Sequence, residues 1–295
     1  MNLSRNLPQK LFDIGNHLFL MFLVLICIYP FYYIFIYSIS IPTEAAKGGI
    51  YLVPKGFSLS NYLQLFKLNG IVHAFFISAS RAVLGTAVTL FCTSMFAYAL
   101  TKSTLKYRKL MYRVTLSTMY INAGLIPWYI TMKTLGLKDN FLLYILPSAI
   151  IAFFLILIKT YIEQLPSSLE ESAMMDGGGV FQIYIQIILP LCVPVLGVVA
   201  IFSTVNQWNT WQDNFFLAGS PNLQTLQLLL LSYLTDQTSN LMAIGTNISK
   251  VTVVEVTPSS IRMTITMIVT LPILFVYPLF QRFFTSGMLL GAVKG

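Results

Sequence analysis

The chain has 295 residues, of which 56% are hydrophobic and only 9% are charged. Soluble globular proteins usually carry about 25% charged residues, so this chain lacks the charge that covers a water-facing surface. An enlarged soluble core does not account for the composition, because a chain of this length has too much surface for its volume. The net charge of +8 comes from basic residues spread over short loops, which favours orientation in a lipid bilayer over nucleic-acid binding.

Six segments are long and apolar enough to cross a membrane, which takes ~20 residues. They are, in chain order, residues 14–40, 75–101 (with an oblique start at Ile71), 110–132, 141–162, 190–212 and 261–283. The first is not a signal peptide, because residues 14–43 lack Asp, Glu, Lys and Arg and exceed the roughly 7–15 apolar residues of such a peptide. We therefore predict an all-α integral membrane protein with six transmembrane helices in a single membrane domain, residues 1–295.

A seventh uncharged stretch, residues 214–235, is not predicted to span the membrane. It contains Gly219, Ser220, Pro221, Asn222 and two glutamines. These polar groups would be costly in hydrocarbon, where nothing replaces their bonds to water. We expect a loop followed by a short interfacial helix.

Basic residues in short loops set the orientation, because they stay on the cytoplasmic side. The segment 102–113 holds five of them: Lys102, Lys106, Arg108, Lys109 and Arg113. We expect this segment and both termini in the cytoplasm, and segments 41–70 and 213–260 outside. Arg81 lies within the second span but only ~15 Å along the helix from Ile71, so we expect it to snorkel to the outer interface.

The loop 163–190, between the fourth and fifth spans, has the pattern of a helix-turn-helix. Pro166 and two serines suit a helix start, and acidic residues occupy its first turn. Three glycines at 177–179 break the helix, and a second amphipathic helix then leads to Pro190. This pattern alone fits either a polar connector or a short helix that docks into a groove on a partner.

The spacing of residues in this loop resembles a known motif. Glu171-Ser172-Ala173, three residues, Gly177, nine residues, Ile187, one residue and Leu189-Pro190 match the EAA loop of bacterial ABC-importer permeases. That pattern is Glu-Ala-Ala, three residues, Gly, nine residues, Ile, one residue and Leu-Pro, and Ser172 is the one departure. Three further stretches resemble the maltose-transporter type of carbohydrate permease, in its oligosaccharide and polysaccharide-fragment branch: residues 124–127, 208–211 and 287–295.

The resemblance implies the type I ABC importer permease fold in a bacterial cell membrane. It also implies a heterodimer with a second homologous permease, two ATPase subunits, an extracytoplasmic solute-binding protein and a carbohydrate substrate. The chain has no GxxxxGK[ST] loop and no Gly-Lys dipeptide, so ATP and Mg²⁺ are expected on the ATPase partners. We expect a transport subunit with no enzymatic or metal site of its own.

The resemblance also implies roles for particular residues. The predicted ATPase-coupling residues are Glu170, Glu171, Ser172, Ala173, Asp176, Gly177, Ile187, Leu189 and Pro190. The cytoplasmic tail 284–295 ends in Gly291, Ala292, Val293, Lys294 and Gly295. These five residues either insert between the ATPase subunits or form a frayed terminus.

Sugars bind to aromatic ring faces combined with polar groups. Aromatic and amide side chains near the predicted spans are therefore candidates for the substrate path. They are Tyr120, Asn122, Asn206, Trp208, Asn209 and Trp211, with Trp128 as a further candidate. Trp128 and Trp211 equally fit the aromatic belt found at membrane interfaces.

Two other functions are weighed against this one. An ion-coupled secondary transporter needs a buried acidic relay, and the candidate residues Asp13, Glu163, Asp176 and Asp236 fall at helix ends or in loops. A permease for amino acids or peptides is an alternative within the family, and the tail and tryptophan motifs argue against it.

Overall fold

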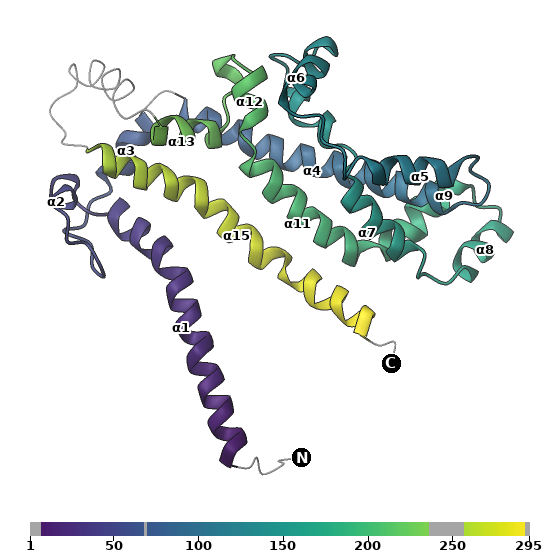
Figure 1. Cartoon of the computed structure of the whole chain (residues 1–295), viewed down its shortest axis with the longest axis horizontal. Helices are drawn as coiled ribbons and strands as arrows, with labels where there is room; N and C mark the ends of the chain where they lie inside the picture. The colour runs from purple at the N-terminus through teal and green to yellow at the C-terminus, as the bar shows by residue number, and fades with distance from the viewer. Residues whose placement is uncertain (1–6, 68–69, 236–256, 293–295) are drawn as a thin grey trace. The chain divides into compact units, whose positions relative to one another are not determined.

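The computed structural model describes residues 7–67, 70–235 and 257–292. Within these ranges the regular elements are helices (Figure 1). The chain divides into two compact units, residues 1–69 with 232–271, and residues 70–231 with 272–295. Helix α15 (Pro258–Ala292) contributes to both units.

The first unit is organised around the C-terminal end of α1 (Leu7–Ser38), where α2 (Pro42–Ala46) and α3 (Ser60–Lys67) follow. A small core of Ile36, Tyr37, Ala45 and Ile50 is buried there, with Met263 of α15 packed against it. Only 6% of the apolar window of α1 is buried. Such a helix suits a lipid or protein environment rather than water.

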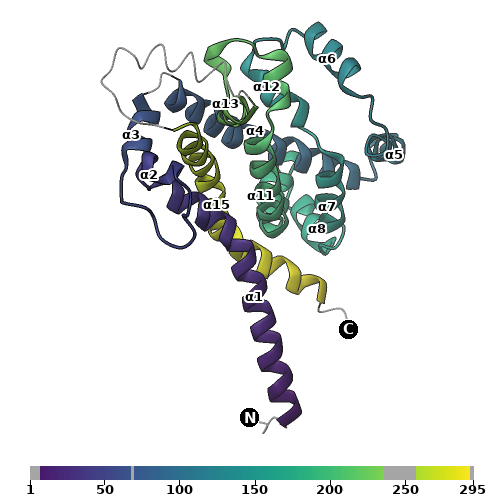
Figure 2. The same ribbon diagram turned by 60° about the vertical axis from the view of Figure 1, so that its left-hand side comes forward.

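The second unit is built on α4 (Ile71–Thr101), α7 (Ala152–Ile162) and α11 (Val193–Asn209), which pack together (Figure 2). Small residues line the packed face of α4, including Gly85, where an added Cβ would lie 2.6 Å from the amide nitrogen of Gln207. Small side chains let helix backbones approach closely, which drives helix association in membranes.

Shorter helices join the three long ones. They are α5 (Arg108–Ser117), α6 (Leu125–Thr134), η1 (Phe141–Tyr144), η2 (Leu146–Ser148), α8 (Ser168–Met175), α9 (Val180–Ile183), the π-helix η3 (Tyr184–Ile188), α10 (Leu189–Leu191), α12 (Gln212–Leu217), η4 (Pro221–Leu223) and α13 (Leu226–Thr235). The 10-residue α13 follows a loop, as predicted for residues 214–235, and is too short to span a bilayer.

Three helical stretches in the described residues are long and apolar enough to cross a membrane: Gln9–Ser38, Ile71–Thr101 and Pro258–Phe275. Two bent pairs also qualify if each counts as one span, Phe141–Ser148 with Ala152–Ile162 (47°) and Val180–Leu191 with Val193–Asn209 (79°). These five elements overlap the first, second, fourth, fifth and sixth predicted spans, although the fifth begins at Val180, within the loop 163–190, and not at residue 190. The all-helical architecture agrees with the predicted fold class.

The predicted third span, residues 110–132, is not one continuous helix in the structure. Helix α5 ends at Ser117, and α6 begins only at Leu125. The side-chain oxygen of Asn122 accepts a hydrogen bond from the Gly124 amide at 2.9 Å, and Gly124 has φ +82°. An Asx turn followed by a positive φ interrupts an α-helix, whatever the hydropathy of its flanks.

The bend in the fourth element is stabilised from α4. The hydroxyls of Thr89 and Thr93 donate to the carbonyls of Ser148 (2.7 Å) and Ala149 (3.1 Å), which lie at the break. Carbonyls freed by a broken helix need such partners inside a membrane. The polar face of α4 therefore allows the neighbouring element to bend.

Candidate coupling hairpin and transport cavity

The loop 163–190 forms the predicted helix-turn-helix, here named the coupling hairpin. Helix α8 carries Glu170 and Glu171 in its first turn, where negative charge interacts favourably with the positive end of the helix dipole. It ends in a Schellman motif, in which the Gly178 amide donates to the Ala173 carbonyl (2.9 Å) and the Gly177 amide to the Met174 carbonyl (3.0 Å). The glycines thus terminate the helix and reverse the chain.

The three glycines of the hairpin have different roles. Gly177 has φ +84°, a conformation that side chains with a Cβ rarely adopt. A Cβ on Gly178 would lie 2.8 Å from the Ala173 carbonyl oxygen, whereas one on Gly179 would meet nothing within 4 Å. Only the first two glycines are therefore required by the turn.

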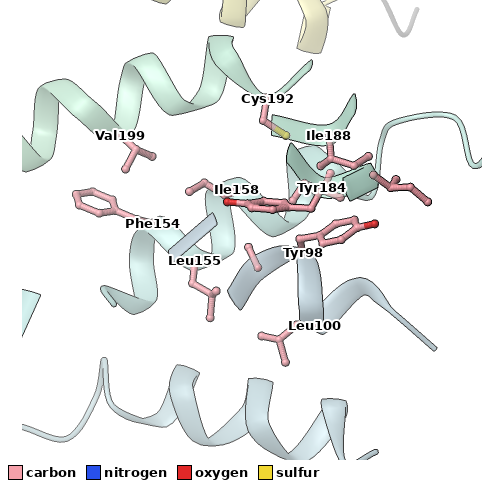
Figure 3. Packing of buried hydrophobic residues seen from close by; sticks show 12 residues of the cluster. Tyr98, Leu100, Phe154, Leu155, Ile158, Tyr184, Ile188, Cys192 and Val199 are labelled. Carbon is pink, nitrogen blue, oxygen red and sulfur yellow. The ribbon is translucent and has the colours of Figure 1, made fainter. Parts of the chain in front are cut away.

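The hairpin is tied to the C-terminal end of α4 by charge and by aromatic rings. The Lys102 ammonium forms an ion pair with Glu170 and lies 4.0 Å from the centre of the Tyr98 ring. The rings of Tyr98 and Tyr184 stack with their centres 5.4 Å apart (Figure 3). The Tyr184 hydroxyl also shares a 2.7 Å hydrogen bond with the Ser94 hydroxyl. The basic loop after α4 and the hairpin therefore lie at the same end of this unit.

The predicted coupling residues divide into an outward and an inward set. Glu171, Ser172, Asp176 and Gly177 are exposed, and Met175 beside them is 89% exposed. By contrast, Glu170 is held by Lys102, and three residues pack against the core in Figure 3: Ala173, Ile187 and Leu189. Pro190 lies near the 79° bend that leads into α11.

A cavity of about 720 Å³ lies toward the other end of the same unit, near the N-terminal half of α4. Its aromatic lining comes from Trp128, Tyr144, Trp211 and Phe216. Its polar and charged lining comes from Arg81, Asn122, Ser148, Asn206, Gln207, Thr210, Gln212 and Asp213. The cavity thus combines ring faces with many hydrogen-bonding groups.

Arg81 does not snorkel to the interface, so that prediction was wrong. Its guanidinium is 3% exposed and forms a bidentate ion pair with Asp213, with N–O distances of 3.0 and 2.5 Å. It also donates to the Gln207 side chain (3.0 Å) and to the Thr210 carbonyl (2.9 Å), and lies over the Tyr144 ring. A buried charge with a complete set of partners is more stable than one reaching for distant water.

Gln207 extends this network to the bend in the fourth element. Its amide accepts from Arg81 and donates to the Ser148 hydroxyl at 2.5 Å. Arg81, Asp213, Gln207 and Ser148 all line the cavity, so one connected set of hydrogen bonds fixes a wall of it. Sequence reasoning missed this set, although an uncharged stretch interrupted by one Arg is itself a signal for a buried partner.

The cavity contains some of the predicted substrate-path residues and not others. Asn122, Asn206 and Trp211 line it, as does Trp128. Trp208 is buried instead against Phe75, with ring centres 6.0 Å apart. The exposed side chains of Tyr120 and Asn209 are not part of the lining.

The predicted ATPase-contacting tail lies mostly outside the described residues. Gly291 and Ala292 are the last residues of α15, and Val293, Lys294 and Gly295 fall beyond it. Among the described residues there is no cluster of three or more His, Cys, Asp or Glu side chains that could hold a metal ion.

Comparison with known proteins decides the family. No family model matches the chain. It is 33% identical over 292 residues to the polygalacturonan/rhamnogalacturonan transport system permease protein YtcP of Bacillus subtilis, covering 98% of this chain and 100% of the relative. The chain belongs to the permease subunits of carbohydrate ABC transporters.

Two further comparisons agree with this assignment. Protein LplC of Bacillus subtilis is 36% identical over 288 residues, covering 97% of this chain and 96% of the relative. A crystal structure of a bacterial ABC transporter involved in the import of the acidic polysaccharide alginate contains a chain with a TM-score of 0.86 and 27% identity. That match covers 96% of this permease and 100% of the other chain, so the two folds correspond over their whole length. The permease is a multi-pass membrane transport subunit, not an enzyme in itself.

Proposed function

We propose that this permease forms one half of an import path for an oligosaccharide or a polysaccharide fragment. A second homologous permease completes the path, two ATPase subunits bind ATP and Mg²⁺, and an extracytoplasmic solute-binding protein delivers the sugar. The names of the relatives, which refer to polygalacturonan, rhamnogalacturonan and alginate, support a carbohydrate over an amino acid or peptide.

The composition of the cavity carries the substrate proposal. Sugars combine apolar C–H faces with many hydroxyls, so aromatic rings and amide side chains together recognise them. Trp128 and Trp211 supply rings, and Asn122, Asn206 and Gln207 supply amides. The volume of about 720 Å³ lies within the ~300–1,000 Å³ typical of small-molecule sites.

The outward set of the coupling hairpin is the proposed contact with the ATPase. The exposed carboxylate of Glu171 offers a charge-assisted hydrogen bond to a basic group on the partner. Met174 and Met175 are exposed beside it, and Met side chains adapt to irregular grooves. Movement of α8 would then reach α4 through Glu170 and Lys102.

A six-crossing topology with both termini in the cytoplasm fits this arrangement. It requires α5 and α6 to cross together as an interrupted third span, beside the five elements that qualify by length and composition. The basic loop after α4 and the coupling hairpin lie at one end of α4, as two cytoplasmic loops must. At the other end, His73 lies 2.8 Å from the carbonyl of Asn222, so the start of α4 contacts the predicted outer segment 213–260.

The C-terminal residues 291–295 are proposed to reach the ATPase subunits from the same side. Deleting residues 290–295 is expected to lower uptake more than expression. Equal loss of both would assign the tail a folding role only.

The test of the substrate proposal is ATP-driven uptake by the whole transporter, reconstituted with its partner permease, ATPase and binding protein. Trp211→Ala is expected to reduce oligosaccharide uptake while ATPase co-purification stays normal, because it removes a ring from the cavity wall. Trp208→Phe is the matched control, since Trp208 packs on Phe75 outside the cavity. Full uptake by Trp211→Ala and by Trp128→Ala would refute this cavity as the sugar path.

A further inference from the structure

Four residues of α4 recur at every fourth position and so lie on one face of the helix. They are Arg81, Gly85, Thr89 and Thr93. Three of them donate hydrogen bonds to neighbouring elements, the arginine to the Gln207 side chain and the two threonines to the carbonyls of Ser148 and Ala149. The glycine stands in the middle of this face without a side chain of its own.

The space that Gly85 leaves open is occupied by the side chain of Gln207. The three atoms nearest to a Cβ added at Gly85 all belong to that side chain, with Nε2 at 2.6 Å, Cδ at 2.7 Å and Cγ at 3.2 Å. All three distances are below the ~3.5–4.0 Å of ordinary contacts between non-bonded heavy atoms. The missing side chain of Gly85 therefore makes room for the Gln207 amide.

The Gln207 amide is held in this position from two sides. Its oxygen accepts a hydrogen bond from Nε of Arg81 at 3.0 Å, and its nitrogen donates to the Ser148 hydroxyl at 2.5 Å. The residue is buried, so water does not replace a bond that is broken. Displacing the amide by the width of a methyl group would leave buried polar groups unpaired, which is unfavourable.

The two partners of Gln207 belong to different elements of the cavity wall. Arg81 lies on α4, and Ser148 lies in η2 at the bend of the fourth element. Both residues line the cavity, as Gln207 itself does. Gln207 therefore fixes two parts of the wall relative to each other, and a site that binds a ligand depends on such support for its geometry.

We infer that Gly85 is a positioning residue of the transport cavity, because it provides the seat from which Gln207 holds Arg81 and Ser148 in the wall. The inference rests on the proposed function, since oligosaccharide transport is the activity that this wall serves. Gly85 is not one of the described residues that line the cavity, so it acts through Gln207 and not on the sugar. The competing role is close approach of the α4 and α11 backbones, which small residues also provide.

The experiment starts from Gly85→Ala in the complete transporter, reconstituted with its partner permease, ATPase and binding protein. The added methyl group displaces the Gln207 amide, so oligosaccharide uptake is expected to fall several-fold. ATP hydrolysis stimulated by the sugar-loaded binding protein should fall less, because the coupling hairpin contacts the opposite end of α4. The number of ATP molecules hydrolysed per sugar imported should therefore rise, whereas a simple loss of folded transporter would lower both rates in proportion.

A double-mutant cycle separates the two roles of Gly85. In a Gln207→Ala background, Gly85→Ala is expected to have little further effect on uptake, because the atoms that its Cβ would meet are gone. Thr86→Ala is the matched control for helix packing, since the Thr86 hydroxyl shares a 3.1 Å hydrogen bond with that of Thr204 between the same two helices. It should leave uptake and the ratio of ATP to sugar close to those of the unmodified transporter.

Two results would overturn the inference. They are an equal loss of uptake from Gly85→Ala with and without the Gln207 side chain, and an unchanged ratio of ATP to sugar in Gly85→Ala. If Gln207→Ala itself abolishes uptake, the fraction of purified transporter that survives heating is measured for the same four combinations, and the loss caused by Gly85→Ala should again depend on Gln207. Failure of the unmodified transporter to import an oligosaccharide would refute the proposed function instead.

Discussion

Two ion pairs join α4 and the residue after it to other parts of the second unit, and the two pairs differ in how deeply they are buried. Near its N-terminal half, Arg81 and Asp213 are 3% and 10% exposed and share further hydrogen bonds with Gln207. Just beyond its C-terminal end, Lys102 and Glu170 are 14% and 21% exposed. The first pair belongs to the cavity wall and the second to the coupling hairpin.

The difference in burial implies a difference in mechanical role. Breaking a buried pair by removing one partner costs about 3–5 kcal/mol, because a charge is left without compensation. Pairs near the surface contribute about 0–1 kcal/mol, since water and ions replace the partner. We therefore expect the cavity wall to stay fixed during transport, and we propose that the Lys102–Glu170 contact is the weaker of the two and the one that an ATPase partner would displace.

The largest effect is expected from Arg81→Met. It leaves the buried Asp213 carboxylate unpaired and removes the donors to Gln207 and the Thr210 carbonyl. The free energy of unfolding should fall by about 3–5 kcal/mol. Heating the purified transporter and measuring the surviving fraction by size-exclusion chromatography tests this directly.

The control for this prediction removes both charges. The double variant Arg81→Met with Asp213→Leu eliminates the uncompensated carboxylate and should recover a substantial part of the lost thermal stability. If Arg81→Met alone matches the unmodified transporter, the pair does not hold the cavity wall.

An intermediate effect is expected in the turn of the hairpin. Gly177→Ala forces a Cβ into φ +84°, at a cost of roughly 1–2 kcal/mol. Gly178→Ala places a Cβ 2.8 Å from the Ala173 carbonyl oxygen. Both should reduce the amount of ATPase that co-purifies with the permease.

Gly179→Ala is the matched control, because its Cβ meets no atom within 4 Å and its φ is −73°. It should retain full ATPase association. If all three alanine variants behave alike, the geometry of the Schellman turn does not position the hairpin for its partner.

The smallest effects distinguish the two adjacent glutamates. Glu170→Gln weakens the contact with Lys102 and should lower the stability of the permease by about 1 kcal/mol or less, with ATPase still bound. Glu171→Gln, at an exposed position, should leave permease stability unchanged and weaken ATPase association. The opposite assignment of the two phenotypes would exchange the inward and outward roles.

The coupling hairpin could be predicted from the sequence because its determinants are local. Pro166, the first-turn carboxylates and the glycines at 177 and 178 fix the helix start and the reversal within a dozen residues. The extent of α4 could be predicted equally well, since Ile71 begins a long, mostly apolar run in which Arg81 is the one Asp, Glu, Lys or Arg residue. The break at Asn122 was signalled locally too, but apolar content outweighed it in the prediction.

The cavity could be predicted only in part because its partners are distant in sequence. Asp213 lies 132 residues from Arg81, and no periodicity links them. Trp211 lines the cavity and Trp208 does not, for a geometric reason. Trp208 is still on α11, whereas Thr210 has extended backbone, which redirects Trp211 into the cavity.

The most direct test of the whole account is uptake of a labelled oligosaccharide into vesicles that contain the permease, its partner permease and the binding protein. We expect uptake only when the ATPase subunits and ATP are present on the hairpin side, and no uptake when a proton or sodium gradient replaces them. Gradient-driven uptake without the ATPase would contradict the account, because the coupling hairpin would then have no partner to follow.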